Sequence, residues 1–377
     1  MSVIARVFAV AVVLVACVGP EARPNATLRL EVGSPTPSPL TSAAAAATSR
    51  PTGSPAPATT SRPPASPGPI TLKEFPVPAG SAPHDVAPAA DGGVWYTAQA
   101  KGELGYLDPK TGQTRHVKLG QGSSPHGVIL GPDTAPWVTD SGLNAIVRVD
   151  PRTNEVKRFP LPGAPANLNT AAFDHLGDLW FTGQNGYIGR LDRRGRVQQV
   201  AAPGGRGPYG IAVQPTSATS QKVFYASLAG DHIGQIVFGP PVEAGSDEPQ
   251  SFTGRPIQPP TAGAGPRRAW SDSKGIVWVS EWNVGQLGRY DPYTQQWKEW
   301  KLPGARPQAY AVYVDDRDVV WLSDFGANAI VRFDPATEKF DVFPHAANGN
   351  VRQINGRPGE VWGALSGLDR LLLVTTR

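Results

Sequence analysis

The chain has 377 residues, of which 18% are charged, and its formal net charge is +4 at pH 7. Residues 1–69 contain five arginines and two glutamates, so residues 70–377 are nearly neutral. A nearly neutral domain offers no basic face to a phosphate backbone, which argues against nucleic acid as a partner. The single cysteine excludes an intramolecular disulfide.

Residues 1–17 have the features of a secretory signal that ends in a lipidation site. Arg6 precedes an apolar run over residues 7–15, which is shorter than the roughly 20 residues that a membrane-spanning helix needs. Residues 14–17, Leu-Val-Ala-Cys, resemble the lipobox of bacterial lipoproteins. We therefore predict a signal peptide that ends at a lipidated Cys17. An ordinary signal peptide with an incidental cysteine is the alternative.

Residues 18–69 are rich in Pro, Ser, Thr and Ala, with 12 prolines from Pro20 to Pro69. Such a segment cannot bury enough apolar surface to offset its ordering entropy, so we predict a disordered tether. Anchor and tether together predict an exported protein on the outer face of the bacterial cytoplasmic membrane or on the cell surface. Its only contact with the membrane would be the lipid.

Residues 70–377 repeat one unit seven times. Each unit carries a marker aromatic residue at intervals of 41 to 54 residues: Trp95, Trp137, Trp180, Phe224, Trp278, Trp321 and Trp362. Seven units of about 42 residues have the period of propeller blades. We expect the marker aromatics to fill the space between neighbouring blades.

Each unit reads as four short strands, with runs of Val, Ile and aromatic residues between Gly, Pro, Asp and Asn. In the second unit the predicted strands are His126–Leu130, Pro136–Thr139, Ala145–Val149 and Glu155–Leu161. The sequence Asp-Pro-x-Thr suits a type I turn between the third and fourth strands. It occurs four times, at Asp108, Asp150, Asp291 and Asp334.

The last unit ends after its third strand, and the segment before the first unit supplies the fourth. Residues 70–80, ITLKEFPVPAG, match the fourth-strand pattern of the other units. The sequence therefore predicts an all-β fold, a seven-bladed β-propeller of four-stranded blades that is closed by its N-terminal strand. Residues 239–265 read as an insertion in the fourth blade.

Three stretches carry a resemblance to the streptogramin (virginiamycin B) lyase family: GDLWFTGQNGYIGRLD at 177–192, PYGIAV at 208–213 and NVGQLGRYD at 283–291. The resemblance covers residues 70–377. It implies a seven-bladed propeller and an enzyme that linearises cyclic depsipeptides by elimination across an ester C–O bond, with Mg²⁺ as the cofactor.

The resemblance also places the family's catalytic groups in the sixth and seventh blades. They are the His of a Pro-His pair, a Glu-Pro-His sequence and a Glu after the marker Trp. This chain has Pro307-Gln308, Asn350-Val351-Arg352 and Gly363-Ala364-Leu365 at those places. The same elimination is therefore not expected at that position.

Two rings of side chains are predicted to line the channel mouth. One is the residue after the Pro that opens a unit, or after Leu168 or Val351 where the Pro is replaced, namely His84, His126, Asn169, Tyr209, Arg267, Gln308 and Arg352. The other lies three residues after each marker aromatic, namely Ala98, Asp140, Gly183, Ser227, Glu281, Asp324 and Leu365. From these we take Tyr209, Arg267, Glu281, Gln308, Asp324 and Arg352 as the candidate ligand-binding residues.

A first cluster consists of His84, His126 and Asp140. Two imidazoles and a carboxylate can hold Mg²⁺ or another divalent metal, or act as a base with its orienting group. Alternatively, Pro-His is a strand-entry motif whose histidines bond to neighbouring backbone.

A second cluster consists of Arg267, Arg352, Glu281 and Asp324. The arginines can bind a carboxylate or sulfate, or all four can form a ring of salt bridges. Two functions follow from the clusters. The first is a monomeric, tethered module that binds a small molecule or cell-wall component at its mouth. The second is a C–O lyase, or another metal-assisted enzyme, with a rotated site at His84, His126 and Asp140.

Overall fold

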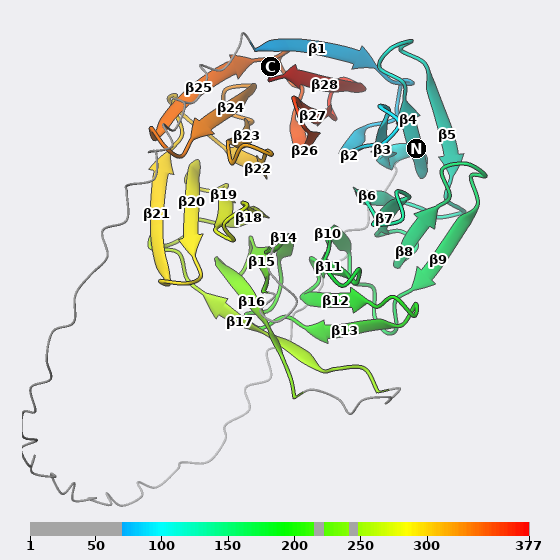
Figure 1. The fold of residues 1–377 in the computed structure, drawn as a ribbon, viewed down its shortest axis with the longest axis horizontal. Helices are drawn as coiled ribbons and strands as arrows, with labels where there is room; N and C mark the ends of the chain where they lie inside the picture. Colours follow the sequence, from blue (N-terminus) through cyan, green and yellow to red (C-terminus); the bar gives the residue numbers. More distant parts are fainter. Residues whose placement is uncertain (1–69, 215–221, 241–247, 377) are drawn as a thin grey trace, which may run out of the picture. The chain divides into compact units, whose positions relative to one another are not determined.

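The computed structural model describes residues 70–214, 222–240 and 248–376. Seven antiparallel sheets of four strands each surround a central axis (Figure 1), so the predicted seven-bladed β-propeller is confirmed. The predicted signal peptide with Cys17 and the tether lie outside the described residues. In the described part of the chain, no helix is both long and apolar enough to span a membrane.

Each blade runs from an inner strand at the axis to an outer strand at the rim (Figure 1). The innermost strands are β2 (Pro83–Pro88), β6 (Pro125–Leu130), β10 (Leu168–Phe173), β14 (Pro208–Val213), β18 (Pro266–Ser271), β22 (Ala309–Val314) and β26 (Val351–Arg357). The second strands are β3 (Val94–Ala98), β7 (Pro136–Asp140), β11 (Leu179–Gly183), β15 (Val223–Ser227), β19 (Val277–Glu281), β23 (Val320–Asp324) and β27 (Glu360–Leu365).

The third strands are β4 (Glu103–Leu107), β8 (Ala145–Val149), β12 (Tyr187–Leu191), β16 (His232–Phe238), β20 (Gln286–Asp291), β24 (Ala329–Asp334) and β28 (Arg370–Thr375). The outermost strands are β5 (Thr114–Lys118), β9 (Val156–Pro160), β13 (Val197–Ala201), β17 (Phe252–Ile257), β21 (Gln296–Lys301), β25 (Lys339–Pro344) and β1 (Thr71–Pro76). One short 3₁₀ helix, η1 (Gln99–Lys101), follows β3.

Hydrogen bonds from the Asp side chain explain the turns between third and fourth strands. In the second blade, Asp150 Oδ1 accepts from the backbone N–H groups of Arg152 (2.9 Å) and Thr153 (3.1 Å). Each of the four Asp-Pro-x-Thr sequences lies between a third and a fourth strand, as predicted. The four strands predicted for this blade agree with the observed strands to within one residue at every end.

The ring closes through the N-terminal strand. β1 pairs antiparallel with β28 from Thr71 opposite Thr375 to Pro76 opposite Arg370. The ring of Phe75, which is 4% exposed, lies 5.4 Å from the ring of Trp362. Residues 70–80 therefore supply the missing strand, as predicted, and blade seven has no exposed third-strand edge.

The marker tryptophans pack between blades. Five of them are at most 2% exposed: Trp95, Trp180, Trp278, Trp321 and Trp362. Three donate the indole N–H to the carboxylate six residues earlier, at 2.9 to 3.0 Å: Trp180 to Asp174, Trp278 to Asp272 and Trp321 to Asp315. The buried indole N–H is thus satisfied while the ring fills the space between blades, as expected.

The predicted insertion at 239–265 is only partly correct. Residues Phe252–Ile257 of that stretch form β17, the outer strand of blade four. The additional residues are those between Phe238 and Phe252, in the connection between β16 and β17. Because the stretch is rich in Pro and Gly, the sequence pattern did not indicate the strand that it contains.

Replacing Phe75 by Ala tests the closure. We expect Phe75→Ala to lower the free energy of unfolding by about 3 kcal/mol, the range for removing a buried aromatic ring. Thr71→Ala, at an exposed position of the same strand, is the control and should change stability little. Denaturant unfolding of both variants makes the comparison, and equal stability of the two would contradict closure by β1.

Candidate functional site

An irregularity near the start of every inner strand shapes the channel mouth. In β2 the register with β3 shifts between Pro83 and Val86, and all the other inner strands shift at the corresponding place. A bulge of this kind re-aims side chains that would otherwise alternate between the two faces. Two consecutive residues, such as His84 and Asp85, can therefore both reach groups on other blades.

Hydroxyl groups hold these bulges in place from one blade to the next. Thr97 Oγ1 accepts from the N–H of Asp85 (3.0 Å) and donates to the carbonyl of His126 in the next blade (3.0 Å). Thr139, Thr182 and Ser280 make the same pair of hydrogen bonds in blades two, three and five. The backbone of the mouth is therefore fixed before any ligand binds.

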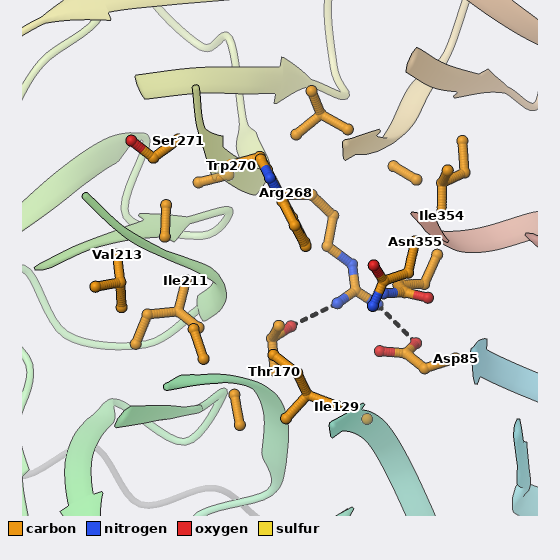
Figure 2. Close-up of a pocket in the computed structure, with 18 of the residues that line it drawn as sticks. Asp85, Ile129, Thr170, Ile211, Val213, Arg268, Trp270, Ser271, Ile354 and Asn355 are labelled. Carbon is orange, nitrogen blue, oxygen red and sulfur yellow. Dashed lines mark hydrogen bonds and ion pairs between the residues drawn. The ribbon is translucent and has the colours of Figure 1, made fainter. Parts of the chain in front are cut away.

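The guanidinium of Arg268 spans the channel. It donates to Asp85 Oδ1 at 3.1 Å and to Thr170 Oγ1 at 2.5 Å, and thus links blade five to blades one and three (Figure 2). Asp85 Oδ1 also lies 2.7 Å from His84 Nδ1. Arg268 and Asp85 are 3% and 1% exposed. Burial raises the pKa of the Asp85 carboxyl, and the charge of Arg268 opposes that shift.

A cavity of about 220 Å³ is lined by the inner strands and by Arg268 (Figure 2). Most of its walls are apolar, with Ile129, Ile211, Val213 and Ile354 among them. His84 and Arg267, which directly precede Asp85 and Arg268, do not line this cavity. They lie at the channel mouth, where the side chains are polar or charged.

Two imidazoles lie together at the mouth. The rings of His84 and His126 have centres 3.9 Å apart, and His126 Nε2 lies 3.2 Å from Asn169 Nδ2. Burial, with the charges of Arg268, Arg352 and Arg267, lowers the pKa of His84 well below its usual value. Burial and the neighbouring His84 likewise lower the pKa of His126. Both rings are therefore neutral at neutral pH.

Arg267 is packed against aromatic rings on the other side of the mouth. Its guanidinium carbon lies 3.7 Å from the ring centre of Tyr310, 4.5 Å from that of Tyr209 and 4.8 Å from that of Trp282. It donates to the hydroxyl of Tyr209 at 3.1 Å. Among the described residues neither Arg267 nor Arg352 forms an ion pair, and the buried Nε of Arg267 has no hydrogen-bond partner.

The prediction that Asp140 joins the histidines is wrong. Its carboxylate accepts from the N–H groups of Ser124 and Leu143, both at 2.9 Å, and from the hydroxyl of Ser123. It stabilises the turn after β7 instead. Asp85 takes its place, because one ligand-type atom from each of His84, Asp85 and His126 lies within 4.8 Å of the others.

Gln308 is also not a mouth residue. β22 begins at Ala309, which lies opposite Asp324 just as Pro208 lies opposite Ser227 in blade four. Tyr310 is therefore the counterpart of Tyr209, and Gln308 is exposed outside the strand. The Pro in blade six precedes this register position by two residues, which shifted the sequence-based alignment.

The predicted salt-bridge ring does not form. Asp324 Oδ1 accepts from the N–H groups of Gln308, Gly326 and Ala327, as Asp140 does in its own blade. Glu281 is buried in blade five with no ion pair among the described residues. Of the four residues in that cluster, only Arg267 and Arg352 lie at the mouth. The remaining alternative is that these two arginines bind an anion.

The cluster of His84, Asp85 and His126 does not fit Mg²⁺. Mg²⁺ prefers oxygen ligands in an octahedron, whereas this cluster offers two imidazoles and one carboxylate. That carboxylate is already paired with His84 and Arg268. The arginines that lower the pKa of His84 would also repel a dication.

Replacing Arg268 tests its structural role. We expect Arg268→Met to lower the free energy of unfolding by about 3–5 kcal/mol, because it leaves the Asp85 carboxylate buried without its cation. Adding Asp85→Asn should recover much of that loss. Arg370→Met, which breaks the partly exposed pair with Glu74, should cost less than about 1 kcal/mol. A small effect of Arg268→Met in denaturant unfolding would contradict the clamp.

Comparison with known proteins gives the same fold. Residues 113–244 match the model of the virginiamycin B lyase family. A streptogramin B lyase structure is 21% identical, with a TM-score of 0.71 over 82% of this chain and 98% of its own. The selenomethionine-substituted virginiamycin B lyase from Staphylococcus aureus, and its catalytically inactive variant with quinupristin, are each 19% identical. Both have a TM-score of 0.70 over 82% of this chain and 100% of their own.

No curated protein matches the sequence. The identities to the solved structures are low enough that their likeness establishes the fold alone. The match to the family model adds a sequence relationship over the second to fourth blades. The chain is thus a seven-bladed propeller that resembles the virginiamycin B lyase family, as its repeat motifs predicted.

Proposed function

We propose that the protein binds a small anionic molecule, one that bears a carboxylate, at the mouth of its central channel. The observation that carries this proposal is the charge balance there. In addition to burial, the positive charges of three guanidiniums, those of Arg268, Arg352 and Arg267, lower the pKa of His84. Asp85 is the one carboxylate paired with any of them among the described residues. The mouth therefore carries excess positive charge that an anion would neutralise.

Arg267 and Arg352 are the groups that would contact the ligand. Both are only partly buried, whereas Arg268 is committed to Asp85 and Thr170. A guanidinium binds a carboxylate through two parallel hydrogen bonds. Stacking against aromatic rings holds Arg267 in position, so little side-chain entropy is lost on binding.

The aromatic residues beside the arginines would contact the rest of the ligand. The ring of Phe325 stacks on that of Tyr310 at 4.6 Å, and Trp282 lies 5.4 Å from both. Trp282 and Phe325 are partly exposed. A carboxylate attached to a ring or a short apolar group suits this surface. Small metabolites and carboxylate-bearing fragments of the cell wall belong to that class.

A second candidate function is a C–O lyase, which the His84–Asp85 pair favours. Asp85 at 2.7 Å from Nδ1 could orient His84 as a base. The base would take a proton from the carbon next to the one bearing the ester oxygen, a C=C bond would form, and the carboxylate would leave. The burial of His84 and its lowered pKa weaken it as a base, so binding without catalysis is the preferred function.

Titration with benzoate, followed by tryptophan fluorescence, tests anion binding. We expect Arg267→Met and Arg352→Met each to weaken binding by about 10- to 100-fold, since a hydrogen bond to a charged group is worth ~1.5–3 kcal/mol. Arg115→Met, on the outer strand of blade one, is the control. Benzamide has the same shape without the charge and should bind more weakly. Equal binding of benzoate and benzamide would rule out recognition of the anion.

The same protein can be incubated with quinupristin to test the lyase alternative. Elimination gives a linear product of unchanged mass, so chromatographic retention is the readout. Turnover that disappears in His84→Asn but persists in Arg115→Met would establish the lyase in place of the binding module.

We also propose that the domain is a monomer held at the outer face of the membrane through a lipid on Cys17. The lipobox-like residues 14–17 and the Pro-rich segment that follows support this location. We expect Cys17→Ser to abolish lipid labelling and to release the protein or leave it unprocessed. Membrane fractionation after metabolic labelling makes the comparison. Unchanged labelling of the variant would mean that Cys17 is not the anchor.

A further inference from the structure

Glu281 is a buried carboxyl that no hydrogen-bond donor among the described residues satisfies. Its side chain is 0% exposed, and in the described part of the chain no donor reaches either of its oxygens. The Glu299 carboxyl lies within hydrogen-bonding reach, but it can pair with Glu281 only through a shared proton or a bound cation. Gln286, which lies directly opposite it on β20, has a buried Oε1 that is also without a partner. Buried polar atoms without partners are costly, and a bound ion is one of the groups that can satisfy them.

The pairing of strands gathers further oxygen atoms on the same face of blade five. Residues opposite each other on neighbouring strands share a face, which places Glu281, Gln286 and Glu299 together around Gly288. A side-chain carbon on Gly288 would lie 2.6 Å from Glu281 Oε1. The glycine therefore leaves room for the carboxylate. Residues of this face pack against apolar residues of blade four.

The charges around Glu281 are negative. The carboxylate of Glu299 accepts from the N–H and hydroxyl of Thr261, and Asp231 accepts from two N–H groups in the connection to blade five. In addition to burial, the negative charges of both carboxylates raise the pKa of Glu281. In the described residues no Lys or Arg pairs with any of these three acids. Lys301, on the same face, donates to the carbonyl of Val284 instead.

We propose that a divalent cation with a preference for oxygen ligands, Ca²⁺ by its coordination habit, binds between blades four and five. Glu281 would supply both carboxylate oxygens, and Glu299 and the Gln286 carbonyl would supply the others, with water completing the shell. Ca²⁺ accepts six to eight oxygen ligands in flexible geometry, whereas Mg²⁺ demands a nearly regular octahedron. A site built from the side chains of three adjacent strands suits the more flexible ion.

A shared proton is the competing explanation. Burial, together with the Glu299 carboxylate, raises the pKa of Glu281 to about 8, so a proton could join the two carboxyls. One proton would leave Gln286 Oε1 unsatisfied, whereas a cation would bind all of these oxygens at once. The two explanations differ in their response to metal and to pH, which makes them separable.

The position of the site connects it to the channel mouth. Glu281 lies opposite Pro266, the residue before Arg267, and is followed by Trp282, which contacts the Arg267 guanidinium. A bound cation would therefore fix the backbone that presents this arginine. The site does not depend on the proposed function, because ion binding and anion recognition are measured separately.

Terbium luminescence of the purified full-length protein, stripped of metal with EDTA, locates the ion. Tb³⁺ replaces Ca²⁺ and emits when an excited tryptophan is close. Cζ3 of Trp297 lies 3.3 Å from the same point above Gly288 that Glu281 Oε1 approaches. We expect sensitised emission that Ca²⁺ abolishes by competition. Glu281→Gln should weaken Ca²⁺ binding at least tenfold, whereas Glu338→Gln, at the surface of blade six, should bind as the parent does.

Thermal unfolding provides the second readout. At a Ca²⁺ concentration 100 times its Kd, we expect Tm to rise by about 5 °C. The rise should be larger above the pKa of Glu281 than below it, because Ca²⁺ must displace the proton. Trp297→Phe should weaken the sensitised emission and keep the rise in Tm.

Three results would overturn the proposal. The first is no emission and no Ca²⁺-dependent rise in Tm in the parent. The second is unchanged Ca²⁺ binding in Glu281→Gln. The third is the behaviour of a shared proton: stability without metal that is present at low pH, is lost as pH rises through the folded-state pKa, and loses this dependence in Glu281→Gln, with Ca²⁺ having no effect.

Discussion

The pairing of Arg268 with Asp85 is the constraint on which the mouth depends. Seven inner strands converge at the axis, and a charge buried there must find its partner on another blade. Arg268 does so by crossing the channel to Asp85 and Thr170. This contact holds Asp85 beside His84, and among the described residues it leaves Arg267 and Arg352 without an ion pair.

The remainder of the domain makes that mouth rigid. β1 closes the ring without a disulfide, and the hydroxyls of Thr97, Thr139, Thr182 and Ser280 tie four of the seven bulges to the next blade. The aromatic rings around Arg267 immobilise the guanidinium. An oxygen-rich site behind Arg267, centred on Glu281, would add a bound cation to the same framework. A rigid cationic mouth is suited to binding an anion with little rearrangement.

The fold could be predicted because every repeat encodes the same strands, turns and marker aromatic. The site could be predicted only in part, because it depends on the irregular start of each strand. Taking only the residue after each unit-opening Pro missed Asp85 and Arg268, although their adjacency to His84 and Arg267 was a visible signal. Asp140 was misjudged because an Asp at a strand end stabilises a turn as readily as it binds a ligand.

The central claim is that the channel mouth holds an unneutralised positive charge that recognises anions. Anomalous diffraction from crystals of the protein soaked in iodide tests it directly, since iodide reports where an anion binds without presuming the ligand. We predict an ordered iodide in contact with Arg267 and Arg352 at the mouth. Iodide at other surface sites with none at the mouth, or an Arg267 paired with a carboxylate of the chain, would contradict it.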